Sequence, residues 1–115
     1  MRPQERLRIL SLLRSRIDRE CDIKRHRHGA AIVAPNGRVV AVGVNIRGSG
    51  FSSQFSYHAE EMAIIRAARK GGIPRFSSLL VARLKSDGEW GLSQPCARCD
   101  MVIRESGIKR VEYTL

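Results

Sequence analysis

Two short motifs contain residues whose types and spacing fit a metal site. His58-Ala59-Glu60 begins one segment with helical periodicity, and Pro95-Cys96-Ala97-Arg98-Cys99 begins another. Two cysteines separated by two residues on the first turn of a helix direct both sulfurs to one point, where unpaired amides and the helix dipole stabilise thiolates. An imidazole and two thiolates are typical zinc ligands. Cys96 and Cys99 are therefore candidate zinc ligands, and His58 is a candidate third ligand at the start of the other helix.

The number of protein ligands distinguishes a catalytic zinc from a structural one. Three protein ligands leave a fourth position for water, and zinc lowers the pKa of that water to about 7. Glu60 follows the histidine ligand by two residues, so we expect its carboxylate to move protons for the water. The alternative is a closed structural site, in which Cys21, His26 or His28 is the fourth ligand. That alternative gives no role to Glu60 and Pro95.

Hydropathy patterns predict the elements that position these motifs. Helical spacing and helix-end residues predict helices, and short apolar runs predict strands. The predicted order is helix, strand, strand, helix, strand, helix, strand. Asn36-Gly37 between two apolar runs predicts a β-hairpin, and helices between the later strands make those strands parallel. The predicted helices cover 4–18, 58–70 and 95–106, the strands 30–34, 38–44, 77–84 and 109–114, and the loops 46–57 and 85–91.

Length and charge limit the class of protein. The 115 residues suit a single domain, with an N-terminal helix and basic loop over 1–28 and a catalytic core over 29–114. The net charge of +10 predicts attraction to polyanions or phosphates. The sequence contains neither an apolar run of about 18 residues nor a signal-peptide core, so we expect a cytoplasmic protein that does not bind membranes. Cys21 is expected to be a free thiol at a helix end.

The order and spacing of the two motifs resemble those of the cytidine deaminase superfamily, in the branch whose first ligand is histidine. This branch includes deoxycytidylate deaminases, tRNA adenosine deaminases and editing deaminases of single-stranded DNA or RNA. The resemblance runs from about Gly29 to Thr114 and implies an α/β, three-layer fold, a mixed sheet of four or five strands with helices on both faces. It also implies a homo-oligomer. The family's fifth strand and its helix would lie beyond Leu115, which indicates a minimal domain, an edge covered by another subunit, or a fragment.

The resemblance implies that His58, Cys96 and Cys99 bind one Zn²⁺ ion per chain, and it assigns roles to the residues around the metal. Glu60 would deliver protons while water replaces the exocyclic amine of a base and ammonia leaves. Asn45 would contact the sugar, Ala59 would lie beneath the base, and Tyr57 and Ser93 would line the pocket. Tyr57 and two further aromatic residues before His58, Phe51 and Phe55, either stack on the base or pack on the core.

Three functions are compatible with the sequence. The first is a hydrolytic deaminase of a cytosine nucleoside or nucleotide, acting in nucleotide metabolism. The second is a polynucleotide deaminase acting on cytosine or tRNA adenosine in single-stranded DNA or RNA, favoured by the +10 charge and the aromatic loop. The third is a non-catalytic zinc module that binds nucleic acid. The motifs themselves do not separate cytosine from adenine, or ribose from deoxyribose.

Overall fold

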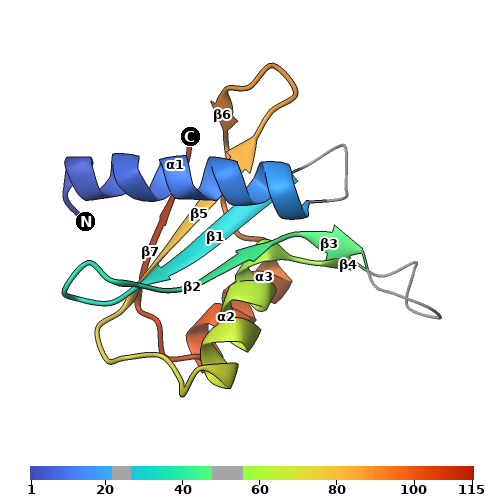
Figure 1. Ribbon diagram of the computed structural model, residues 1–115. Helices are drawn as coiled ribbons and strands as arrows, with labels where there is room; N and C mark the ends of the chain where they lie inside the picture. Colours follow the sequence, from blue (N-terminus) through green and yellow to red (C-terminus); the bar gives the residue numbers. More distant parts are fainter. Residues whose placement is uncertain (22–26, 48–55) are drawn as a thin grey trace.

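The computed structural model describes residues 1–21, 27–47 and 56–115, which form three helices and seven strands. Every predicted helix and strand is present, and the predicted class of α/β fold is confirmed (Figure 1). The helices are α1 (Pro3–Glu20), α2 (Ala59–Arg69) and α3 (Ala97–Glu105), and the longer strands are β1 (Arg27–Val33), β2 (Val39–Val44), β5 (Ser78–Leu84) and β7 (Arg110–Tyr113). Three strands of two residues each are β3 (Ile46–Arg47), β4 (Ser56–Tyr57) and β6 (Trp90–Gly91).

The five-stranded sheet is mixed, as predicted. Its order is β2-β1-β5-β6, and β7 also pairs with β5. β1 runs antiparallel to both β2 and β5, whereas β5 and β7 are parallel because α3 lies in the crossover between them. Both motifs therefore begin helices that connect strands of one sheet.

Two segments predicted to be loops form short pairs of strands at their ends. Over 85–91, Trp90 lies opposite Leu84 in an antiparallel pair, so the prediction of a loop is wrong for β6. The Asp87-Gly88 turn closes this hairpin, with Gly88 at a φ of 87°. Over 46–57, Ile46 pairs with Tyr57, while residues 48–55 lie outside the described residues. The fifth strand of the described sheet is thus β6, and not a strand following β7.

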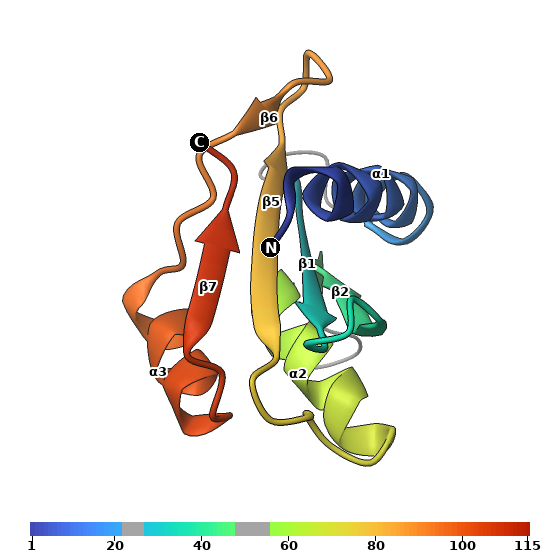
Figure 2. The same cartoon turned by 90° about the vertical axis from the view of Figure 1, so that its left-hand side faces the viewer.

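The helices cover both faces of the sheet, which gives three layers (Figures 1 and 2). One face of the sheet packs against α1, whose buried residues are Ile9, Leu10, Leu13 and Ile17. On the other face, α2 contributes alanines and α3 contributes Ile103 to a cluster with Ile32, Leu79 and Val81. Small residues on α2 allow its backbone to approach the sheet closely. This approach sets the distance between the His58-Ala59-Glu60 motif and β2.

Gly43 is the point of closest approach between β2 and α2. A Cβ atom built at Gly43 would lie 2.3 Å from the carbonyl oxygen of Ala59 and 2.3 Å from the backbone nitrogen of Ala63. Both of these are backbone atoms, so a side chain could be accommodated only by moving the start of the helix. The absence of a side chain at Gly43 thus positions the residues next to His58 and Glu60.

Replacing Gly43 with alanine should lower the free energy of unfolding by about 3 kcal/mol and weaken zinc binding, because it displaces the first turn of α2. Urea denaturation and metal analysis measure the two effects. Gly91→Ala is a matched control, since its Cβ would meet the flexible side chain of Lys85 at 3.0 Å and that side chain can move. A Gly43→Ala protein as stable as Gly91→Ala would contradict this packing.

An ion pair joins α1 to α2 across the edge of β2. Arg66 donates hydrogen bonds to the carbonyl of Val42 at 2.9 Å and to the carboxylate of Glu20 at 3.0 Å. Burial opposes ionisation of Glu20, but hydrogen bonds from Arg16 and Arg66 outweigh this effect and lower the pKa of Glu20. Arg66 therefore provides a hydrogen-bond donor to a carbonyl oxygen of the edge strand β2, and its ion pair with Glu20 helps to hold α2 in place.

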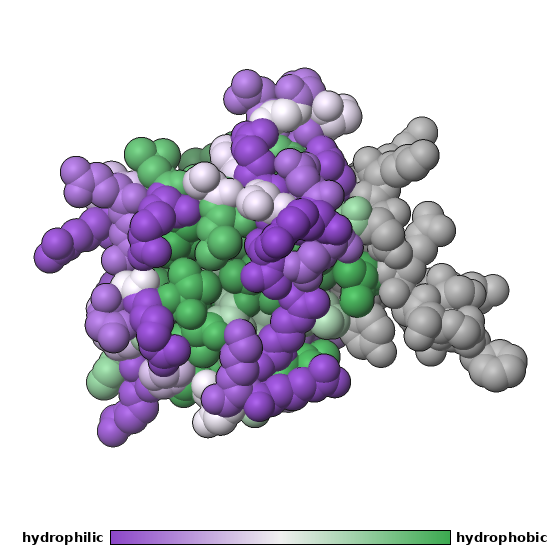
Figure 3. Space-filling view, in the orientation of Figure 1, coloured by the Kyte–Doolittle hydropathy of each residue, from purple (hydrophilic) through white to green (hydrophobic). Residues whose placement is uncertain are grey.

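The basic residues lie at the surface. No lysine or arginine is buried among the residues whose burial is described. On the face shown in Figure 3, hydrophilic residues surround a central hydrophobic area. No helix in the described part of the chain is both long and apolar enough to span a membrane.

Candidate metal centre

The three predicted ligands meet at the N-terminal ends of α2 and α3. His58 immediately precedes α2, Cys96 immediately precedes α3, and Cys99 lies in the first turn of α3. The Nδ1 atom of His58 is 2.9 Å from the Sγ atom of Cys99 and 3.7 Å from that of Cys96. All three potential ligand atoms lie within 4.8 Å of one another. His58 thus joins one cluster of donors with two cysteines that lie 38 and 41 positions away in the sequence.

The electrostatics of this cluster fit a bound cation. Cys99 is fully buried. Burial raises the pKa of the Cys99 thiol far above its usual range, and the negative charge of Glu60 and a hydrogen bond with Cys96 raise it further. Two thiolates beside a carboxylate repel one another, and a divalent cation between the sulfurs offsets that repulsion. One imidazole nitrogen and two sulfurs form a donor set suited to zinc.

A fourth protein ligand is not present in the described part of the chain. No further histidine, cysteine, aspartate or glutamate of residues 1–21, 27–47 and 56–115 joins the cluster. The Sγ atom of Cys21, which is not in a disulfide, instead contacts the carbonyl oxygen of Asn45 at 3.3 Å. His28 lines the adjacent pocket without joining the cluster, and His26 lies outside the described residues. These placements favour a metal site with an open position.

A pocket of about 310 Å³ opens beside the donors. Its volume is near the lower end of the range for small-molecule sites. Glu60, the second residue of α2, is 5% exposed and lines the pocket without belonging to the donor cluster. The other residues of its wall are His28, Asn45, His58, Ala59, Ser93, Gln94 and Cys96.

Three of the four predicted substrate contacts lie on this wall. They are Asn45, Ala59 and Ser93, all buried. The backbone of Tyr57 is in β4, but its side chain lies outside the described part of the structure, as do Phe51 and Phe55. Proximity to the pocket is therefore established for three of these residues.

Hydrogen bonds hold Asn45 in a fixed orientation at the end of β2. The backbone nitrogen of His28 donates to Oδ1 of Asn45 at 2.7 Å, and the thiol of Cys21 donates to the same oxygen at 3.4 Å. The sequence alone indicates His28 only as an alternative fourth ligand. The register that pairs Gly29 with Val44 extends the hairpin to His28 and Asn45, so counting back from the Asn36-Gly37 turn could have placed His28 at the pocket.

The hydroxyl of Ser93 is bound to the scaffold. It donates to the carbonyl of Val81 at 2.7 Å and accepts from the backbone nitrogen of Thr114 at 3.1 Å. The backbone nitrogen of Ser93 also donates to the carbonyl of Thr114 at 3.0 Å. These bonds fix the segment that leads to Cys96 against β5 and the end of β7.

Glu61 and Arg98 connect the two motif helices. The side chain of Glu61 accepts hydrogen bonds from the backbone nitrogen of His58 at 3.1 Å and from Arg98 at 2.6 Å. Burial opposes ionisation of Glu61, but the hydrogen bonds from Arg98 and His58 prevail and lower the pKa of this carboxyl. Arg98 stands between Cys96 and Cys99, so the bridge links the histidine ligand to the cysteine pair.

Replacing Arg98 with alanine should weaken zinc affinity about tenfold, because residues that orient metal ligands typically contribute 10- to 100-fold. Competition with a chromogenic zinc chelator measures this affinity. Arg104→Ala is the control, since Arg104 lies in the last turn of the same helix and pairs with Asp100 at 3.0 Å instead of with Glu61. Equal zinc affinities in the two variants would show that the Glu61–Arg98 bridge does not orient the site.

Comparisons of the fold find deaminases. A deoxycytidylate (dCMP) deaminase from the cyanophage S-TIM5, crystallised with dCMP and dUMP, superimposes with a TM-score of 0.74 at 25% identity, covering 98% of this chain and 82% of that one. A cytidine deaminase from Burkholderia pseudomallei has a TM-score of 0.70 at 22% identity, covering 98% and 83% of the two chains, and supports the likeness of fold.

In a third similar structure, the region that matches this chain is one part of a longer chain. It is a diaminohydroxyphosphoribosylaminopyrimidine deaminase/5-amino-6-(5-phosphoribosylamino)uracil reductase from Thermotoga maritima. It is 31% identical over 75% of this chain and 22% of its own, with a TM-score of 0.52. Among curated protein sequences, no significant match is found.

The sequence profile described as the cytidine and deoxycytidylate deaminase zinc-binding region matches residues 4–115. This match includes both motifs and all the elements that hold them. It confirms the resemblance inferred from the histidine and cysteine spacing. The chain therefore belongs to the cytidine and deoxycytidylate deaminase family.

Proposed function

We propose that this protein is a zinc-dependent hydrolase that deaminates a cytosine nucleoside or nucleotide and releases ammonia. The main support is the position of Glu60, which is buried in the wall of a pocket directly beside the converging His58, Cys96 and Cys99 donors. A carboxylate so placed, outside the donor cluster, is suited to proton transfer. The S-TIM5 relative binds dCMP and dUMP, which differ by the replacement of an amine with oxygen.

Each residue of the centre has a proposed role. His58, Cys96 and Cys99 hold one zinc ion per chain. Bound there, zinc supplies Lewis acidity that makes a hydroxide nucleophile available near neutral pH. Glu60 accepts one proton from water and delivers it to N3 of the base, then transfers the second proton to the departing amine.

The proposed reaction is balanced with water as the only co-reactant. The oxygen of water forms a bond to C4 of cytosine, and the bond from C4 to the exocyclic nitrogen breaks. The two protons of water are found on N3 of the uracil product and on ammonia. Glu60 begins and ends the cycle as a carboxylate, which is consistent with a single carboxylate of the described pocket serving as both acid and base.

The pocket walls suit a flat base attached to a sugar. Ala59 is fully buried and has a small side chain, so it leaves room for a ring to lie against the start of α2. Asn45, just after β2, and His28, near the start of β1, lie together on the wall, where polar groups could contact the sugar. We propose Asn45, Ala59, Tyr57 and Ser93 as substrate contacts, Ser93 chiefly through the segment it holds in place.

A second candidate function is deamination of single-stranded DNA or RNA. The observation that favours it is the net charge of +10. Every lysine and arginine whose burial is described is at least partly accessible to a polyanion. Counterion release makes polynucleotide binding fall by orders of magnitude between low and moderate salt. Turnover of a mononucleotide should change much less over the same range.

A substrate panel tests the proposed function. Zinc-loaded protein is incubated with cytidine, deoxycytidine, their monophosphates, and cytosine- or adenosine-containing single-stranded oligonucleotides, and ammonia and ultraviolet absorbance are followed. We expect deamination of a cytosine nucleoside or nucleotide. Activity on oligonucleotides alone, with a steep salt dependence, would establish the second candidate. Absence of ammonia with every compound would indicate a non-catalytic zinc module and contradict the proposal.

A further inference from the structure

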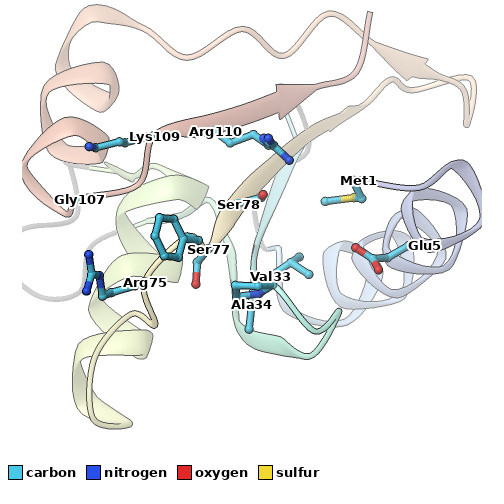
Figure 4. A pocket seen from close by; sticks show the side chains of 12 residues that line it. Met1, Glu5, Val33, Ala34, Arg75, Ser77, Ser78, Gly107, Lys109 and Arg110 are labelled. Atoms are coloured by element: carbon cyan, nitrogen blue, oxygen red, sulfur yellow. The ribbon is translucent and has the colours of Figure 1, made fainter.

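A second and larger cavity lies at the opposite end of the sheet from the metal centre. Its volume is about 480 Å³, and Val33, Ala34, Ser77 and Ser78 form its base (Figure 4). Val33 ends β1, whereas His28 near the start of the same strand lines the catalytic pocket. Five residues of a strand span about 16 Å, so the two cavities are separate sites.

The charge around this cavity is predominantly positive. Arg75, Lys109 and Arg110 line it, and none of the three makes an ion pair with any described residue. The single acidic residue of the lining is Glu5 of α1, which lies with Met1 on the side away from Arg75 and Lys109 (Figure 4). Three cations from two separate segments therefore line the cavity, with Arg75 and Lys109 on one side and Arg110 reaching toward Met1, and they outnumber the single carboxylate (Figure 4).

Phe76 adds an aromatic surface to the same side. Its φ of 65° is in the left-handed region, which is unfavourable for a bulky residue. The residue is nonetheless 82% exposed, so packing in the core does not explain its presence. The guanidinium of Arg75 lies 5.3 Å from the centroid of the ring. A strained, exposed aromatic beside unpaired cations is an arrangement typical of a ligand site.

We propose that this cavity binds a phosphate-bearing small molecule with a planar ring. The phosphate interacts with Arg75 and Lys109, which supply charge-assisted hydrogen bonds, and Arg110 adds positive charge from across the cavity. The planar ring stacks on the accessible surface of Phe76. The site uses none of the residues of the metal centre, so the inference does not depend on the proposed deaminase activity.

Isothermal titration calorimetry at low ionic strength tests this site, with adenosine 5′-monophosphate, adenosine and inorganic phosphate as probes. Arg75→Ala/Arg110→Ala should weaken binding of the monophosphate at least tenfold. The matched control Arg69→Ala/Arg104→Ala removes two exposed arginines that do not line the cavity, and should change the affinity less than threefold. Adenosine should bind at least tenfold more weakly than its monophosphate.

Phe76→Gly separates the contribution of the ring from that of the charges. Glycine tolerates the left-handed backbone, so this variant should fold at least as well as the parent, as thermal denaturation would show. We expect it to weaken binding of the monophosphate severalfold and to leave binding of inorganic phosphate unchanged. Equal affinity for phosphate and adenosine 5′-monophosphate, with no effect of Phe76→Gly, would overturn the stacking contact.

Three outcomes would overturn the site as a whole. They are absence of monophosphate binding, undiminished binding in Arg75→Ala/Arg110→Ala, and equal losses in that variant and its control. The last would indicate attraction to the overall charge of +10. Because this test measures binding, a protein that fails the substrate panel can still bind the monophosphate here. A protein that deaminates a substrate can likewise fail to bind the monophosphate at this site.

Discussion

Replacing Glu60 with glutamine should lower the rate of ammonia release about 1,000-fold, while the protein stays folded and binds zinc. The amide has nearly the shape of the carboxylate but cannot accept and return a proton, and general acid–base catalysis contributes about 100- to 10,000-fold. Glu60 is buried in the pocket and does not belong to the donor cluster, so its charge is not needed to hold the metal. Steady-state ammonia release and zinc content measure the two properties on the same sample.

Glu105→Gln is the matched control for this substitution. Glu105 is an exposed residue at the end of α3, and the change removes the same charge at a distance from the first turn of that helix. The control should retain full activity. A Glu60→Gln protein with more than about a tenth of the parent rate would contradict the role of Glu60 as the proton carrier.

Replacing Cys99 with serine should remove zinc from the protein and abolish activity. A serine hydroxyl stays protonated and is a poor zinc ligand, and Cys99 is the buried sulfur whose Sγ lies 2.9 Å from His58. Metal binding stabilises the native state, so the melting temperature should fall as well. Metal analysis and thermal denaturation follow these losses, and a strong chelator should reproduce both in the parent protein.

Cys21→Ser distinguishes loss of a ligand from loss of any thiol. Cys21 contacts Asn45 through its sulfur, and a serine hydroxyl can make an equivalent hydrogen bond. This variant should keep its zinc and most of its activity. Retention of stoichiometric zinc by Cys99→Ser, or its loss from Cys21→Ser, would contradict the assigned ligands.

The donor cluster could be predicted because local sequence determines most of its geometry. A Cys-x-x-Cys pair at the start of a helix brings two sulfurs together by helical periodicity alone. The periodic apolar residues of α1 and the Asn36-Gly37 turn likewise indicated their elements within a few residues. The approach of His58 to the cysteines came from the resemblance to a family, since nothing local joins α2 to α3.

The features that the sequence did not predict depend on contacts between distant segments. The bridge from Arg98 to Glu61 joins residues 37 positions apart, and each of them alone resembles an ordinary surface charge. The requirement for glycine at Gly43 arises only from the approach of α2. Trp90 forms a strand because Leu84 is its partner, although a polar turn separates them. The cavity at Phe76 likewise combines segments that share no pattern.

X-ray absorption at the zinc edge tests most directly whether the centre is catalytic or structural. The predicted coordination of the zinc-loaded protein is two sulfurs, one imidazole nitrogen and one light atom from solvent, and Glu60→Gln should show the same shell. A fourth protein donor, whether a third sulfur or a second imidazole, would close the metal to substrate and contradict the proposed enzyme.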